Sequence, residues 1–161
     1  QEWVADADNE DQHGAPSFLS FRRATKEIYL ENRSKGAVSF LAWDGDCVAG
    51  AAELSPVQLD GAVQDTTTRI YYVTDVVTAT LHRRKGVAQS LMGAIEQEAR
   101  RRQISYLVLH VEADNEAALR LYQERAGYTQ PSQALLEILD TGRLHKNTNT
   151  WGQTLLAKSL G

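Results

Sequence analysis

The fold is decided by the stretch Arg83-Arg84-Lys85-Gly86-Val87-Ala88-Gln89, which joins a predicted strand to a predicted helix. Residues 68–78, before it, are rich in β-branched and aromatic side chains and predict a central strand. In residues 86–102, apolar side chains recur at helical spacing and predict a long helix. Gly86 and Ala88 are small, so a ligand could approach the backbone closely at this junction.

The start of this helix has the properties of an anion-binding site. The N–H groups of a first helical turn lack partners, and the helix dipole makes that end positive. Arg83, Arg84 and Lys85 add cationic charge at the same place. These features favour a bound phosphate, although small residues also occur at such turns for packing alone. The stretch lacks the Gly-Lys-Ser/Thr of a Walker loop and the three spaced glycines of a dinucleotide fingerprint.

Length and composition are those of a globular protein. The chain has 161 residues, of which 42% are hydrophobic, and this suffices for one core. No apolar run approaches the roughly 18 residues that span a membrane, so we expect a soluble intracellular protein with no membrane partner. The chain begins with Gln1 rather than Met, which leaves room for an upstream targeting segment that was removed.

The net charge of −4 originates near the N-terminus. Residues 1–16 hold five acids and no lysine or arginine, and they predict a loose acidic arm. The remaining residues, 17–161, are close to neutral and predict a single domain. Because no basic surface is apparent, no nucleic-acid partner is expected.

Cysteine and histidine usage indicates neither a disulfide nor a metal site. Cys47 is the single cysteine, which excludes an internal disulfide. It lies in a strand-like run, so we expect a buried apolar role for its side chain. The four histidines are scattered without metal-ligand spacing, and therefore no metal is predicted.

The first half of the chain reads as a helix followed by a hairpin. Phe18–Ser34 has the spacing of an amphipathic helix. Ala37–Trp43 and Cys47–Leu54 are strand-like, and Asp44-Gly45-Asp46 between them is a strong hairpin signal. Ser55–Thr67 contains proline and glycine without periodicity and is predicted to be a loop.

The second half alternates strands and helices. Ser105–Val111 is an apolar run that predicts a buried strand. Asp114-Asn115 offers a cap for the next helix, and Gly127 would end that helix. Gln130–Asn149 is left open between a strand and a short helix, and Trp151–Leu160 predicts a final strand.

The order of these motifs resembles the GCN5-related N-acetyltransferase (GNAT) superfamily. Its central signature, Arg/Gln-x-x-Gly-x-Gly/Ala, is filled here by Arg83, Gly86 and Ala88. A second motif, Asn-x-x-Ala-x-x-x-Tyr, is filled by Asn115, Ala118 and Tyr122. The two motifs have the order and separation typical of the superfamily, and the resemblance covers about residues 37–129.

The resemblance implies an α/β fold with a central, mostly antiparallel mixed sheet flanked by helices. Two neighbouring strands would splay apart, and acetyl-CoA would enter the gap as the cosubstrate. Backbone groups of the central strand would hold the pantetheine arm, and those of the basic loop would hold the pyrophosphate. The cofactor-binding residues implied in this way are Val76, Val77, Thr78, Arg84, Lys85, Gly86, Val87, Ala88, Gln89 and Asn115.

Three side chains are implied in catalysis by the same resemblance. Tyr122 would protonate the departing thiolate. His110 and Tyr72 are similar in position to residues of N-terminal acetyltransferases that order a water, which takes a proton from the amine. An α-amine has a pKa near 8, so a histidine suffices as the base. A glutamate on the central strand, the family's other base, is missing, and Asp75 is the only acid there.

Structural interpretations of the same residues remain open. His110 could be a core histidine bonded to backbone, and Tyr122 could simply pack on the sheet. Tyr71 and Tyr72 point to opposite faces of a strand, so Tyr71 could be the functional one. Surface positions are expected for Glu53 and Glu112 at strand ends and for the helix end Arg100–Arg102.

The function that follows is direct transfer of an acetyl group to a primary amine, without an acyl-enzyme. We expect a protein or peptide α-amine as acceptor, with lysine ε-amines as a second class, because the predicted pocket is aromatic and neutral. A polyamine would instead need several carboxylates. The alternatives are a small-molecule (polyamine or arylalkylamine) acetyltransferase and a silent CoA-binding module. The segments Tyr71-Tyr72 and Leu155–Lys158 are similar to those of plastid members of the GNAT superfamily. The plastid stroma is therefore an expected compartment beside the cytoplasm. We expect a monomer or a weak homodimer.

Overall fold

The computed structural model describes residues 33–59, 68–141 and 152–161. The chain divides into two compact units, Gln1–Ser34 and Lys35–Gly161, and each is described by itself. In the first unit only Arg33 and Ser34 are described, and both are helical. The predicted acidic arm and nearly all of the predicted helix Phe18–Ser34 therefore lie outside the described residues.

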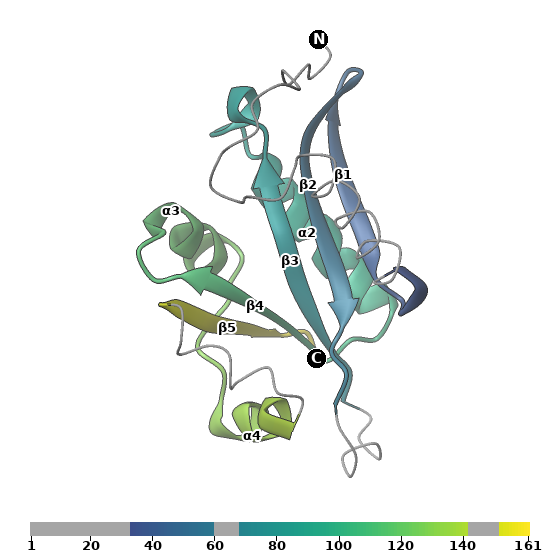
Figure 1. The fold of residues 1–161 in the computed structure, drawn as a ribbon, viewed down its shortest axis with the longest axis vertical. Helices are drawn as coiled ribbons and strands as arrows, with labels where there is room; N and C mark the ends of the chain where they lie inside the picture. Colours follow the sequence, from purple (N-terminus) through teal and green to yellow (C-terminus); the bar gives the residue numbers. More distant parts are fainter. Residues whose placement is uncertain (1–32, 60–67, 142–151) are drawn as a thin grey trace, which may run out of the picture. The chain divides into compact units, whose positions relative to one another are not determined.

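The second unit is built on a mixed sheet with the strand order β1-β2-β3-β4-β5 (Figure 1). Neighbouring strands are antiparallel, except that β3 and β4 are parallel. This confirms the predicted α/β fold with a mostly antiparallel sheet. The strands are β1 Val38–Asp44, β2 Cys47–Pro56, β3 Ile70–Thr78, β4 Tyr106–Glu112 and β5 Gln153–Ser159.

Strands β1 and β2 form the predicted hairpin, in which Gly45 adopts a φ of 58° that suits a residue without a side chain. Strand β2 is longer than predicted and includes Ser55 and Pro56. These two residues pair with Tyr72 and Tyr71 of β3, a long-range contact that local sequence does not reveal. The predicted loop therefore begins only after Pro56, and its residues 60–67 lie outside the described part of the chain.

Strands β3 and β4 lie side by side only over their first residues. Parallel pairing runs from Ile70 opposite Tyr106 to Tyr72 opposite Val108 and ends there. Both strands continue, and Figure 1 shows them diverging. The sheet therefore opens beyond Tyr72, as the splayed strands of the predicted fold require.

The described helices of the second unit lie in two connections of the chain, from β3 to β4 and from β4 to β5. As predicted, a long helix, α2, follows the basic loop, and its apolar residues face the sheet. The segment Gln130–Asn149, for which the sequence favours neither a strand nor a helix, contains helix α4. None of the helices described is long and apolar enough to cross a membrane. The helical elements are η1 Thr80–His82, α2 Val87–Arg101, α3 Glu116–Leu119, the π-helix η2 Arg120–Arg125 and α4 Gln133–Thr141.

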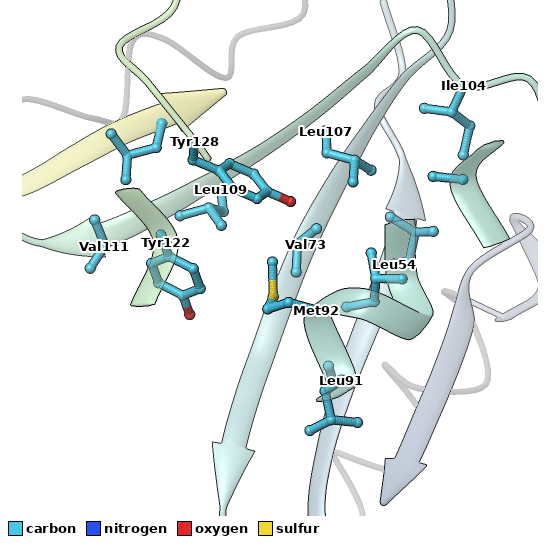
Figure 2. Packing of buried hydrophobic residues seen from close by; sticks show 14 residues of the cluster. Leu54, Val73, Leu91, Met92, Ile104, Leu107, Leu109, Val111, Tyr122 and Tyr128 are labelled. Atoms are coloured by element: carbon cyan, nitrogen blue, oxygen red, sulfur yellow. The ribbon is translucent and has the colours of Figure 1, made fainter. Parts of the chain in front are cut away.

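Apolar side chains form one cluster on each face of the sheet. The first cluster packs between the sheet and α2, where Met92 of α2 lies near Val73 of β3 (Figure 2). The second cluster joins Val108 of β4 to Leu135 and Leu139 of α4. Alternate residues of β4 belong to different clusters, as the two-residue period of a strand requires.

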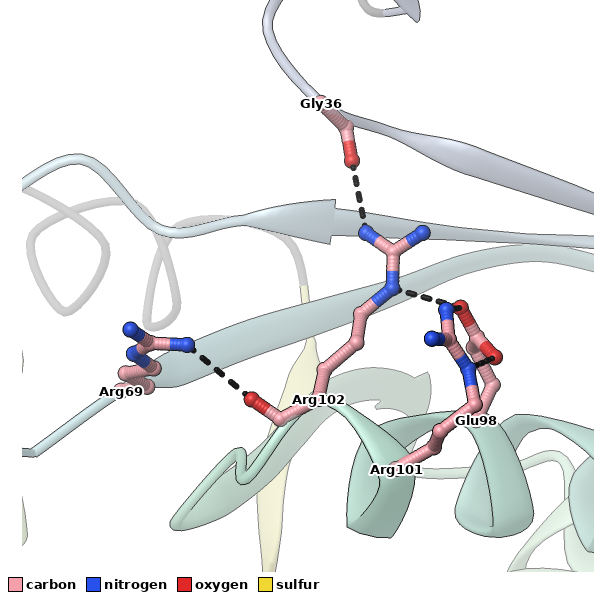
Figure 3. A network of polar contacts seen from close by, with 5 residues as sticks. All are labelled: Gly36, Arg69, Glu98, Arg101 and Arg102. Atoms are coloured by element: carbon pink, nitrogen blue, oxygen red, sulfur yellow. Dashed lines mark hydrogen bonds and ion pairs between the residues drawn. The ribbon is translucent and has the colours of Figure 1, made fainter.

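The C-terminal end of α2 is fastened by a network of arginines (Figure 3). Arg101 and Arg102 donate hydrogen bonds of 2.6–2.7 Å to the Glu98 carboxylate. Arg102 also donates to the carbonyl of Gly36, and Arg69 donates to the carbonyl of Arg102. The two guanidinium groups lower the pKa of Glu98 to about 2. This helix end, predicted to be merely solvated, thus connects α2 to the segments that precede β1 and β3.

Two side chains lie elsewhere than predicted. Cys47 is exposed, because it stands at the turn end of β2 rather than in its buried middle. Glu53, expected at the surface, is only 7% exposed, since β2 continues past it. Its carboxylate accepts a hydrogen bond of 2.9 Å from the Ser55 hydroxyl. Glu112, at the end of β4, is exposed as predicted.

Candidate active site

Helix α2 begins at a loop whose backbone leaves N–H groups available. Arg84 and Gly86 have φ angles of 65° and 82°, in the left-handed region. The first helical hydrogen bond is donated by the Ser90 N–H to the Gly86 carbonyl at 2.9 Å. The N–H groups of residues 87–89 consequently have no acceptor within the helix. They lie at the positive end of the helix dipole, beside the arginines of the loop.

A pocket of about 540 Å³ opens at this loop. One wall consists of the end of β3, the loop and the start of α2, and the other wall consists of α3 and η2. Of the residues predicted to bind the cofactor, those that line the pocket are Thr78, Arg84, Gly86, Val87, Ala88 and Gln89.

The other predicted cofactor residues lie outside the lining of this pocket. Val76 and Val77 precede Thr78 on β3, beyond the last pair with β4. Lys85 is an exposed loop residue. Asn115 caps α3, where its side-chain oxygen accepts a hydrogen bond of 3.1 Å from the Ala118 N–H. The predicted cap is thereby confirmed, and a contact of Asn115 with the cofactor stays a prediction.

The sequence interpretation missed the second wall of the pocket. Ala117, Leu121 and Glu124 recur at helical spacing on one face, and this spacing was the signal that could have identified them. Arg120 and Arg125 extend from the same wall. Together with the loop arginines they make the pocket cationic, and this charge fits a ligand with several phosphate groups.

Tyr72 and His110 meet where the sheet opens. The Tyr72 hydroxyl oxygen lies 2.5 Å from His110 Nδ1, and the ring centroids are 5.4 Å apart. Tyr72 packs beside the second cluster, on the face of the sheet opposite α2, whereas Tyr71 packs beside the first cluster. It is therefore Tyr72, and not Tyr71, that shares a face with His110.

Burial sets the protonation of this pair. Burial lowers the pKa of His110 below its usual value, so its imidazole is neutral at pH 7. Burial also raises the pKa of Tyr72, with a contribution from the charge of Asp75, so its phenol keeps its proton. His110 Nε2 is buried and has no hydrogen-bond partner among the described residues. A neutral imidazole with one nitrogen engaged by Tyr72 can exchange a proton through the other.

Tyr122 lies on the other face of the sheet from Tyr72 and His110. It belongs to the π-helix η2, and its ring meets Tyr128 edge-on at a centroid distance of 6.2 Å (Figure 2). Burial raises the pKa of Tyr122, which keeps the phenol protonated. π-helical turns are rare and frequently occur at functional sites. The structure thus brings Tyr72 and His110 together and places Tyr122 apart from them.

His82, which precedes the loop, also lines the pocket. Its Nε2 lies 3.1 Å from the Asp44 carboxylate, and the contact ties the β1–β2 hairpin to the pocket. His82 Nδ1 is buried without a hydrogen-bond partner in the described part of the chain. Within residues 33–59, 68–141 and 152–161, no group of three or more His, Cys, Asp or Glu side chains could hold a metal ion.

A sequence profile of the acetyltransferase (GNAT) family matches residues 4–128. The chain belongs to this family. It is accordingly an acetyl-CoA-dependent N-acetyltransferase that acts on an amine. A search of curated proteins found no match.

Solved structures share this GNAT fold. The ribosomal-protein-alanine N-acetyltransferase of Brucella melitensis has a TM-score of 0.62 at 21% identity, covering 85% of this chain and 78% of that one. The ribosomal-protein-S18-alanine N-acetyltransferase of Escherichia coli has a TM-score of 0.59 at 17% identity, covering 84% and 77%. The yncA protein of Salmonella typhimurium, solved with its cofactor acetyl-CoA, has a TM-score of 0.61 at 17% identity, covering 86% and 73%. At these identities the likeness establishes the fold alone.

Proposed function

We propose that this GNAT protein acetylates protein α-amines, with lysine ε-amines as a second acceptor class. The observation that carries the proposal is the contact between the Tyr72 hydroxyl and His110 Nδ1 where the sheet opens. A neutral imidazole there is a base of the strength that an α-amine needs, because the α-amine itself has a pKa near 8.

The cofactor-binding residues act through backbone groups and through the cationic side chains of the loop. The N–H groups of residues 87–89 and the cations of Arg84 and Lys85 bind the pyrophosphate. Beyond Tyr72, strand β3 has no pairing with β4, so the backbone groups of residues 76–78 on that side are available to the pantetheine arm. Asn115 contacts the cofactor from the start of α3. When bound, acetyl-CoA supplies the activated acetyl group.

The protein moves one proton from the amine and one to the leaving thiolate. In the tautomer that we propose, His110 Nδ1 donates its hydrogen to the Tyr72 oxygen, and Nε2 accepts the amine proton through a water. The neutral amine nitrogen gives up this proton as it bonds to the carbonyl carbon and the carbon–sulfur bond breaks. Tyr122 donates its phenolic proton to the departing thiolate from the other side of the opening. No acyl-enzyme forms on this route.

Two features support a protein substrate. The side chains that meet at the opening, a phenol and an imidazole, are neutral at pH 7, which suits a peptide backbone better than a polycation. Two of the structural neighbours are named as N-acetyltransferases of a ribosomal-protein alanine. The α-amine is also easier to deprotonate than a lysine side chain, by about two to three pKa units.

One observation favours the second candidate, a small polyamine as acceptor. Glu53 is buried on β2, and its neighbour Ser55 pairs with Tyr72. Because Glu53 and Ser55 share a face of β2, the carboxylate lies on the same face of the sheet as Tyr72 and His110. A diagonal neighbour on an adjacent strand is within reach of a long side chain, so this carboxylate could attract a cationic amine.

A rate comparison distinguishes the two candidates. Peptides that start with Met, N-blocked lysine peptides and spermidine are compared at several pH values by thiol release. We expect the Met peptides to have the highest kcat/KM, and His110→Ala to lower it about a hundredfold or more. Glu53→Gln should raise the KM for spermidine and leave that for the Met peptide unchanged, with Glu112→Gln as the exposed control on β4.

Two other results of the rate comparison would contradict the proposed function. A kcat/KM for spermidine about tenfold or more above that of every peptide would show that the acceptor class is wrong. If no amine released thiol above background, the silent CoA-binding module would be preferred.

A further inference from the structure

We propose that Lys158 is a positioning residue that holds Tyr122 in place for proton donation. The inference rests on the proposed acid role of Tyr122. Lys158 lies on β5 and was not assigned a function from the sequence. Its ammonium group makes two short contacts that join β5, α2 and the end of the helix that carries Tyr122.

The two contacts use both the charge and the donors of the ammonium group. Lys158 Nζ lies 2.5 Å from Glu96 Oε1 of α2 and donates a 2.6 Å hydrogen bond to the Ala126 carbonyl. Both charged side chains are only 20% exposed, so water screens the pair poorly. Ala126 directly follows η2, and a cation at this place also complements the negative end of a helix dipole.

The end of η2 needs such a tie because its own hydrogen bonding is irregular. The Ala126 N–H donates to the Leu121 carbonyl, five residues earlier, at 2.9 Å. Gly127 then turns the chain with a φ of 72°, and the Tyr128 N–H donates to the Tyr122 carbonyl. A π-helical turn is less stable than an α-helical one, so the position of the Tyr122 backbone depends on contacts from outside the helix.

The ion pair also lies beside the ring on which Tyr122 rests. Tyr128 packs edge-on against Tyr122, and the charge of Glu96 acts on the Tyr128 phenol. The Tyr128 hydroxyl is buried without a hydrogen-bond partner among the described residues. Lys158 neutralises Glu96 next to this phenol. Removing the Lys158 cation would leave the half-buried Glu96 carboxylate without a counter-charge. It would also disturb the packing of Tyr128 against Tyr122.

The chain offers a matched control for the loss of a link between α2 and β5. Arg100 of α2 donates a 2.8 Å hydrogen bond to the Leu160 carbonyl, just after β5. This link connects α2 to the end of β5, as the Lys158 pair does, but its hydrogen bond does not involve the residues of η2. Arg100→Met therefore tests the general effect of loosening α2 from β5.

The experiment is a double-mutant cycle of Tyr122→Phe and Lys158→Met. It measures kcat with a Met-started peptide, the affinity for acetyl-CoA by calorimetry, and the melting temperature. We expect Tyr122→Phe to lower kcat about a hundredfold and Lys158→Met to lower it about tenfold, with unchanged acetyl-CoA affinity. Lys158→Met in the Tyr122→Phe background should lower kcat no further, because the lysine acts through the tyrosine.

Two comparisons separate positioning from a general structural role. Lys158→Arg keeps the cation and should recover most of kcat, and Arg100→Met should leave kcat unchanged. If Lys158→Met does not fold, Lys158→Gln, which keeps one donor for the Ala126 carbonyl, takes its place in the cycle.

The outcomes distinguish the inference from the function on which it rests. Fully multiplicative losses in the cycle, or a Lys158→Met enzyme with unchanged kcat, would overturn the positioning role while Tyr122 remains the acid. An unchanged kcat in Tyr122→Phe would instead overturn the acid role itself, and the positioning role with it.

Discussion

At the scale of single residues, the environment of a side chain decides what it can do. Burial shifts the pKa values of His110 and Tyr72 in opposite directions. It lowers the pKa of the imidazole and raises the pKa of the phenol. The imidazole is consequently neutral and the phenol protonated near pH 7. This combination permits a hydrogen bond between them without a charge on either group.

The first prediction concerns the pH dependence of acetylation. The pKa of His110 is lowered, so its inactive protonated form accumulates only at pH below the usual 6.5. We expect log kcat/KM for a Met peptide to fall with a slope of one below pH about 8, as the amine protonates, and with a slope of two only at still lower pH, below the lowered pKa of His110. In His110→Ala the slope should stay at one down to the lowest pH.

Tyr71→Phe is the matched control, because Tyr71 faces the other side of β3. It should retain the change of slope. A wild-type profile with a slope of one throughout the acid range would contradict the role of His110 as base.

At the scale of elements, helix α2 has two ends with different tasks. Its N-terminal end leaves N–H groups available at the pocket, and its C-terminal end is fastened by the arginine network (Figure 3). The first arrangement serves binding and the second stability. A prediction follows for each end.

The second prediction concerns Gly86, where α2 begins. Its φ of 82° strains any other residue, although a Cβ there would meet open space. Gly86→Glu should abolish acetyl-CoA binding in calorimetry, because it adds like charge and bulk where we propose that the phosphates bind. Gly93→Glu, at an exposed position in the middle of the same helix, is the control and should bind normally. Unchanged affinity in Gly86→Glu would refute the location of the cofactor site.

The third prediction concerns Glu98, whose pKa falls from 4.5 to about 2 in the folded protein. A lowered carboxyl pKa stabilises the fold above pH 4.5, and this contribution is lost as the pH falls through 4.5 towards 2. Glu98→Gln should lower the melting temperature at pH 7 by about 2–4 °C, an effect that shrinks as the pH falls below 4.5.

Glu116→Gln is the comparison for this prediction, because the Glu116–Arg120 pair is exposed and 3.8 Å apart. It should leave the melting temperature unchanged. Equal shifts for the two variants, or a Glu98 effect that persists undiminished at low pH, would show that the arginine network does not hold this end of α2.

At the scale of the whole molecule, the opening of the sheet lies between the residues that we propose for the two proton transfers. Tyr72 and His110 share the face of α4, and Tyr122 belongs to the cluster on the face of α2. A cofactor that enters between β3 and β4 would pass from one group to the other. The exposed thiol of Cys47 lies far from Tyr72, since β2 carries it about 26 Å along the strand from Ser55, which pairs with Tyr72.

The fourth prediction is that transfer proceeds in a ternary complex. Cys47→Ala should keep most of the activity, and initial rates should give intersecting rather than parallel double-reciprocal lines. The measurement uses acetyl-CoA and a Met peptide varied against each other. A loss of about a hundredfold with an unchanged melting temperature would indicate a covalent route through Cys47 instead.

The elements that could be predicted from the sequence are those whose signals are local. The Asp44-Gly45-Asp46 hairpin, the start of α2 at Gly86 and the Asn115 cap could all be predicted, because turn and capping preferences depend on neighbouring residues. The two GNAT motifs, around Gly86 and Asn115, sufficed to predict the family and, through the family, the splayed sheet.

Tertiary structure alone decided how distant segments meet. It aligned Ser55 and Pro56 with β3, buried Glu53, exposed Cys47, chose Tyr72 over Tyr71 as the partner of His110, and brought α3 and η2 to the pocket. Each of these outcomes depends on the register between strands or on packing between elements far apart in the chain. A shift of one residue in register turns every side chain of a strand to the other face, so local preferences cannot specify which side chains share a site.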